Sequence, residues 1–149
     1  MRLGSAAVTN DDIDIGEGQV QAGTVIHGGT EHELRAVWRT PAREQLAWVH
    51  VVGSAWQLPN GLSPGASFAA VQDHMGAFTL NGFLGDTSGI VHLDGTTLEP
   101  YANSTTLRLV VDPTKPACQS NELQQSKLTS DAPSLAACAP HLGDLIVRF

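Results

Sequence analysis

The sequence contains few charged residues and almost no lysine. Charged side chains make up 15% of the 149 residues, and the lysines are Lys115 and Lys127, whereas soluble domains usually have about 25% charged residues. The formal net charge is −7, and the arginines are scattered. Because nucleic-acid binding depends on clustered Lys and Arg that neutralise phosphates, we expect no nucleic acid as a partner. A surface of uncharged polar residues costs less to bury against a neighbouring subunit than a charged surface.

Long hydrophobic runs are also missing. A membrane-spanning helix needs about 20 consecutive apolar residues, and no segment approaches that length. Arg2 is followed by a polar, Gly-rich segment rather than by the apolar core of a signal peptide. We therefore expect no membrane insertion. The expected location is cytoplasmic, unless the protein belongs to a virion or another extracellular assembly.

Cysteine is scarce, and both residues of this type, Cys118 and Cys138, lie in one segment rich in proline. Pairing them closes a loop of about twenty residues and contributes about 3 kcal/mol in the chain-entropy account. Free thiols are the alternative. If the disulfide forms, it places the protein outside a reducing cytosol, in a virion or another extracellular assembly.

The stretch 33–56 holds all three tryptophans and predicts two strands joined by a turn. In its first half, Leu34, Ala36 and Trp38 share one face of a period-two pattern, which is typical of a half-buried strand. The second half, 46–56, is apolar on both faces and rich in valine. It predicts a central strand covered on both sides, with a buried helix as the alternative.

The remaining patterns predict an all-β protein. Alternation predicts strands at 19–26, 104–111 and 142–149, and Asn81-Gly82 predicts a tight hairpin turn. One short helix is expected near Ser67–Met75, with Ser67 as its cap and Gly76 after its end. Short strands separated by Gly, Pro and Asn predict an antiparallel β-sandwich or barrel, jelly-roll-like in character. We expect a polar N-terminal arm at 1–18 and a single β-domain at 19–149, with a long irregular loop at 113–140.

One motif resembles the catalytic motif of a hydrolase, but it lacks a backbone N–H group that the reaction needs. Residues 61–65 read G-L-S-P-G, which matches the nucleophile elbow G-x-S-x-G. The residue after the nucleophile must donate its backbone N–H to the oxyanion hole, and Pro64 has none. We therefore predict no catalytic residue.

Two groups of residues suggest metal ions. His27 and His32 lie near Glu31 and Glu33, and the acidic group between Asp11 and Glu17 resembles a fragment of a calcium loop. Neither group has a full set of ligands at the spacing that zinc or calcium sites use. We expect solvated surface residues and no cofactor, with metal binding as the alternative in each case.

Three functions remain open. The first is a non-enzymatic structural subunit of a symmetric assembly, such as a capsid decoration, coat or tail protein of a virus or phage, with copies of itself or other subunits as partners. The second is a carbohydrate-binding β-module that uses Trp38, Trp56 and Tyr101 as ligand-facing aromatics. The third is a small enzyme or metal-binding barrel, which requires two or more histidines to converge with an acidic residue in a cleft; the candidates are His27, His32, His50, His74 and His92.

The exposure of the tryptophans separates the first two hypotheses. A sugar platform needs at least one tryptophan in solvent, whereas a core role buries all three. Aromatic content is only 5%, which favours burial of the tryptophans in the core.

Overall fold

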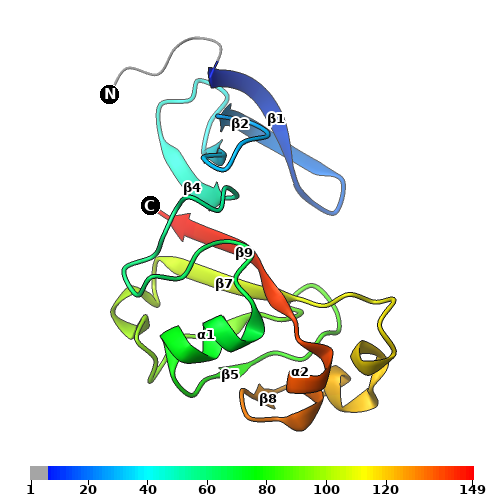
Figure 1. Ribbon diagram of the computed structural model, residues 1–149. Coiled ribbons are helices and arrows are strands. Elements are labelled where there is room, and N and C mark those ends of the chain that lie inside the picture. The colour runs from blue at the N-terminus through cyan, green and yellow to red at the C-terminus, as the bar shows by residue number, and fades with distance from the viewer. Residues whose placement is uncertain (1–6) are drawn as a thin grey trace. The chain divides into compact units, whose positions relative to one another are not determined.

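The computed structural model describes residues 7–149, so the first six residues of the predicted N-terminal arm lie outside the described part (Figure 1). The elements in chain order are β1 (Val8–Gly16), β2 (Gln19–Ile26), β3 (Leu34–Trp38), β4 (Leu46–Val51), α1 (Phe68–Met75), β5 (Thr79–Leu80), β6 (Val91–His92), η2 (Glu99–Tyr101), β7 (Thr105–Val110), η3 (Pro116–Gln119), η4 (Asn121–Gln124), β8 (Leu128–Thr129), α2 (Pro133–Cys138) and β9 (His141–Arg148). Antiparallel sheets dominate, which confirms the predicted all-β, sandwich-like class.

The contacts of the chain form two compact units. Unit 1 is Met1–Trp56 together with Ile146–Phe149, and unit 2 is Gln57–Leu145. Strand β9 therefore contributes its last residues to unit 1 and its first residues to unit 2. The boundary predicted at residue 18 falls in the turn between β1 and β2, which pair antiparallel along their length.

Unit 1 consists of one sheet in the order β1-β2-β3-β4, with the end of β9 beside β4. The predicted tryptophan hairpin is confirmed as β3 and β4. β4 lies between two other strands, as expected, but the prediction that it is covered on both sides is wrong. All six of its residues are half-buried, because the described part of unit 1 has no helix or second sheet to cover it.

Unit 2 contains most of the hydrophobic core. Apart from Ala36 and Val37, every buried hydrophobic residue of the described chain belongs to it. The predicted helix is confirmed as α1: the Ser67 hydroxyl accepts a hydrogen bond from the Ala70 N–H at 3.2 Å, and Gly76 ends the helix with a φ of 75°. Strands β5, β6 and β8 form a small sheet with β5 at its centre.

Two local predictions for unit 2 are wrong. Asn81-Gly82 does not form a tight turn, since neither residue has a positive φ and β5 pairs with β6 across a connection of residues 81–90. A Cβ on Gly82 would lie 1.7 Å from the Gln125 carbonyl oxygen, so this glycine permits close backbone packing instead. The segment 113–140 is not simply irregular, because it contains η3, η4, β8 and a second helix, α2.

Candidate functional site

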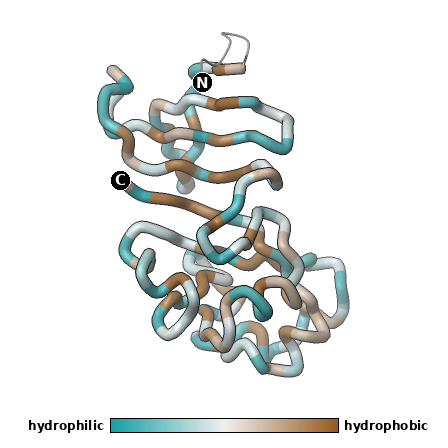
Figure 2. Tube along the Cα trace, turned by 60° about the vertical axis from the view of Figure 1, so that its left-hand side comes forward, coloured by the Kyte–Doolittle hydropathy of each residue, from teal (hydrophilic) through white to brown (hydrophobic). Residues whose placement is uncertain are grey.

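Across β2, β3, β4 and the end of β9, one face of the unit 1 sheet is uncharged and largely apolar. Cross-strand partners share a face, and two rows of partners cross the strands: Ile26, Leu34 and Val51 form one, and Thr24, Ala36, Val49 and Val147 form the other. Trp38 lies on this face too, because its indole N–H donates to the Thr24 hydroxyl at 2.9 Å. We call these eight residues the apolar face; the trace in Figure 2 shows the hydrophobic stretches of these strands.

The larger side chains of the apolar face remain half-buried. Thr24 and Ala36 are 7% and 6% exposed. The other six residues have intermediate exposure. The opposite face differs in charge, since its rows contain Arg35, His50 and Arg148. Across β2, β3, β4 and the end of β9, the sheet thus has an uncharged face that no second layer in the described part of unit 1 covers. On the edge strand β1, Asp12 and Asp14 lie on this same face, opposite Ala22 and Val20.

The outer edge of this sheet is strand β1, which carries several carboxylates. The Asp11 carboxylate accepts the N–H of Asp12 at 2.8 Å, and the Asp14 carboxylate accepts the N–H of Gly16 at 2.8 Å. Acidic side chains along an edge strand oppose pairing with another copy of the same strand, because the like charges repel. Of the acidic group predicted as an alternative calcium site, Asp11, Asp12 and Asp14 thus lie in β1, and Glu17 lies in the turn after it.

A cluster of rings lies on the loops of unit 1. The His27 and His32 rings, from the loop between β2 and β3, have centroids 6.3 Å apart, and the His32 ring meets Trp56, which follows β4, at 6.2 Å in an edge-to-face arrangement. Trp56 is 39% exposed, so the expectation that all three tryptophans are buried is wrong. Trp38 and Trp48 are half-buried. We call His27, His32 and Trp56 the ring cluster.

The loop that carries the two histidines is held against the segment after β4. The Glu33 carbonyl accepts the N–H groups of Val52 and Gly53 at 3.2 and 2.9 Å, and the Glu31 carbonyl accepts the N–H of Ala55 at 2.9 Å. A Cβ on Gly53 would lie 2.1 Å from the Glu31 carbonyl oxygen. Glycine at this position therefore allows the two backbones to approach closely.

The Glu33 side chain fixes the same loop. Its carboxylate accepts the Gly29 N–H at 2.8 Å and the Arg35 Nε–H at 2.7 Å, and its side chain is 9% exposed. The Gly29 hydrogen bond is the main cause that lowers the pKa of Glu33 below its ordinary value, and Arg35 adds to it. Glu33 therefore stabilises the loop as a carboxylate.

We expect Glu33→Gln to lower the free energy of unfolding at pH 7 by about 1–3 kcal/mol, because charge-assisted hydrogen bonds are lost. Since folding lowers this pKa, the stabilisation is complete above the pKa that Glu33 has in the unfolded chain and disappears as the pH falls through the lower pKa of the folded state. Urea unfolding at pH 7, 5 and 3, followed by tryptophan fluorescence, checks this. A difference from the wild type that is as large at pH 3 as at pH 7 would contradict the role of the charge.

The other candidate residues do not join the ring cluster. Tyr101, in η2, is 41% exposed and belongs to unit 2, so unit 1 presents only Trp38 and Trp56 of the three predicted aromatics. In unit 2, His74 Nδ1 lies 2.7 Å from the Asn60 carbonyl, and His92 is held between the Thr79 hydroxyl and the Asn81 carboxamide.

Unit 2 also has two open surface pockets. One, of about 330 Å³, is lined by uncharged residues that include Asn81, Gln124 and Gln125. The other, of about 350 Å³, has Asp94 and Asp131 among its lining residues. No histidine lines either pocket, so neither pocket brings together the two histidines that the small-enzyme hypothesis requires.

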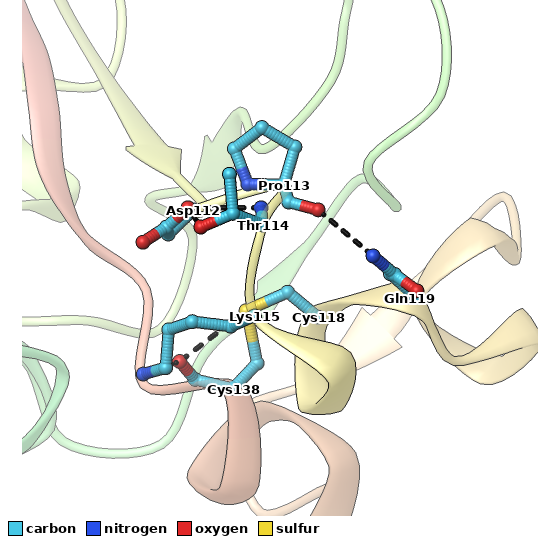
Figure 3. Close-up of a disulfide and its surroundings, with 7 residues drawn as sticks. All are labelled: Asp112, Pro113, Thr114, Lys115, Cys118, Gln119 and Cys138. Carbon is cyan, nitrogen blue, oxygen red and sulfur yellow. Dashed lines mark hydrogen bonds between the residues drawn. A yellow bond between two sulfur atoms is a disulfide. The ribbon is translucent and has the colours of Figure 1, made fainter.

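The structure joins Cys118, within η3, to Cys138, at the end of α2, in a disulfide (Figure 3). Hydrogen bonds surround it. The Lys115 ammonium donates to the Cys138 carbonyl at 2.9 Å, and the Gln119 carboxamide donates to the Pro113 carbonyl at 3.0 Å. The bridge therefore ties the two ends of a segment that has only short elements of its own.

Comparison with known protein families, with curated proteins and with solved structures finds no match for the chain. Between residues 7 and 149, no group of three or more His, Cys, Asp or Glu side chains is arranged to hold a metal ion, so His27 and His32 have no third ligand there. No helix in this part of the chain has both the length and the hydropathy of a membrane span.

The sequence did not predict the ring cluster. The sequence suggested His27 and His32 for a metal site and Trp56 for a sugar platform. It gave no direct sign that the loops carrying these residues lie side by side in the folded chain. Gly53 was the available signal, because a glycine inside an apolar strand pattern often marks a close backbone approach.

Proposed function

We propose that the protein is a non-enzymatic structural subunit of a larger assembly, and that the apolar face of unit 1 packs against a neighbouring copy. The apolar face is the observation that carries this proposal. A sheet normally buries its apolar face against a second layer, about 10 Å away. The described part of unit 1 supplies no such layer, so a partner would complete the core.

The distribution of charge supports a second copy on the face rather than at the edge. The eight residues of the apolar face include no ionisable side chain, so two copies that pack on these residues bring no like charges together there. The acidic residues that share this side of the sheet, Asp12 and Asp14, lie on the edge strand β1. The edge strand β1 carries Asp11, Asp12 and Asp14, which would repel the same residues of another copy. The low charge of the whole chain also reduces the cost of burial at further contacts.

A coat, decoration or tail protein of a virus or phage is the kind of assembly that we propose. Its support is the low charge, the near absence of lysine and the disulfide, which suits a particle that leaves a reducing cytosol. The surface of segment 113–140 would then contact other subunits.

We expect light scattering on the purified protein to give a mass above that of the monomer, stable on dilution. Val51→Lys introduces a charge at the end of β4 on the apolar face, and we expect it to weaken association at least about 10-fold, which corresponds to 1.4 kcal/mol. Thr9→Lys is the matched control, because it adds the same charge to the opposite face through β1, where Thr9 is exposed.

Circular dichroism of each variant separates loss of association from loss of folding. A wild-type protein that stays monomeric at all accessible concentrations would count against the proposal. So would a Val51→Lys variant that is folded and associates as strongly as Thr9→Lys.

A further inference from the structure

The ring cluster has a composition that differs from both faces of the sheet. It places one large exposed aromatic ring, Trp56 at 39% exposure, beside the imidazoles of His27 and His32. The Glu31 carboxylate lies 3.9 Å from His32 Nδ1, and both side chains are more than half exposed. An apolar surface that accepts stacking is therefore bordered by groups that donate and accept hydrogen bonds.

The backbone beneath the ring cluster is well fixed. The hydrogen bonds from Val52, Gly53 and Ala55 to the 31–33 backbone join the loop of the histidines to the segment that ends at Trp56. Glu33 holds the other end of the loop through the Gly29 N–H. Such a frame reduces the ordering entropy that a ligand must overcome, which favours binding.

We propose that the ring cluster is a binding site for neutral saccharides. A pyranose ring has C–H faces that stack on an aromatic ring and hydroxyl groups around its rim that need hydrogen-bond partners. Trp56 supplies the stacking surface, and the His27 and His32 imidazoles with the Glu31 carboxylate supply the partners. No residue of the ring cluster belongs to the apolar face, and the site does not depend on the proposed assembly.

Two other ligand classes fit the ring cluster less well. A metal ion bound by the histidines lacks a third His, Cys, Asp or Glu ligand among the described residues. An acidic polysaccharide would be repelled by the Glu31 carboxylate and by the net charge of −7 on the chain. The chemistry thus favours an uncharged sugar.

The test uses the full-length protein and affinity electrophoresis through gels that contain neutral polysaccharides, namely a glucan, a mannan, a xylan and a galactan, with alginate as the acidic comparison. We expect at least one neutral polysaccharide to retard the wild type, and titration with its oligosaccharides to shift the indole signals of Trp56 in NMR spectra. Trp56→Ala should weaken that binding at least about 10-fold, because stacking on an aromatic ring contributes about 1–3 kcal/mol in the comparable case of nucleic-acid bases.

Tyr101→Ala is the control, since it removes an aromatic side chain of similar exposure, 41%, from unit 2. It should leave the affinity unchanged. The proposal is overturned if no neutral polysaccharide retards the wild type, if alginate alone does so, or if folded Trp56→Ala binds as the wild type does. Retention of binding by Trp56→Phe, which keeps a ring, would support stacking.

Discussion

Replacing Leu107 with alanine is expected to lower the free energy of unfolding by about 2–5 kcal/mol, the range for a large-to-small change in a packed core. Leu107 lies in β7 and is 0% exposed. Because protein interiors are close-packed, its neighbours relax only partly into the space that the lost atoms leave. The measurement is urea unfolding followed by far-ultraviolet circular dichroism, which reports on both units.

Leu34→Ala is the matched comparison in unit 1. Leu34 is half-buried on the apolar face, so the same chemical change removes less surface from contact, and we expect a loss of about 1 kcal/mol. The comparison must be made at a concentration where the protein is monomeric, since a neighbour packed on the apolar face would increase the loss. Equal losses for Leu34→Ala and Leu107→Ala in the monomer would contradict the view that unit 1 lacks a complete core.

The positions of the tryptophans make the same experiment informative about cooperativity. Trp38, Trp48 and Trp56 all belong to unit 1, so their fluorescence follows that unit alone. If the units unfold together, fluorescence and circular dichroism give coincident transitions, and Leu107→Ala shifts both. If they unfold separately, Leu107→Ala shifts only the transition of unit 2.

Sequence patterns correctly predicted the helix and the strands that are specified by residues close together in the chain. The hydroxyl of Ser67 caps α1, and Gly76 supplies the positive φ at its end, so one short stretch specifies the helix. Similarly, alternation predicted β7, in which Thr105, Leu107 and Leu109 are buried and the residues between them are not. These features depend on residues within one or two turns or along one strand.

Features that depend on distant partners were not predicted. The apolar run of β4 indicated cover on both sides, but cover is a property of neighbouring layers, and unit 1 has none in its described part. Asn81-Gly82 has the composition of a tight turn, yet Gly82 packs against the Gln125 carbonyl, more than forty positions along the chain. The contact of His32 with Trp56 likewise follows from the pairing of β3 with β4.

Removing the disulfide is expected to have the other large effect. Cys118 and Cys138 close a loop with a sequence separation of 20 residues, so reduction should cost about 3 kcal/mol. For a chain of this size, we expect the unfolding temperature to fall by about 6–12 °C. The double variant Cys118→Ala/Cys138→Ala should show a similar fall, and adding a reductant to it should change nothing further.

The effect of the disulfide should be concentrated in unit 2. The bridge fixes η3 to α2, whose Leu135 and Cys138 are buried at 0% and 1% exposure, so the reduced chain loses order around a part of the core. Calorimetry with and without reductant measures the fall, and thiol titration establishes that the bridge was present and was opened. A fully reduced protein that unfolds at the temperature of the oxidised one would show that the short elements of segment 113–140 hold that segment without the bridge.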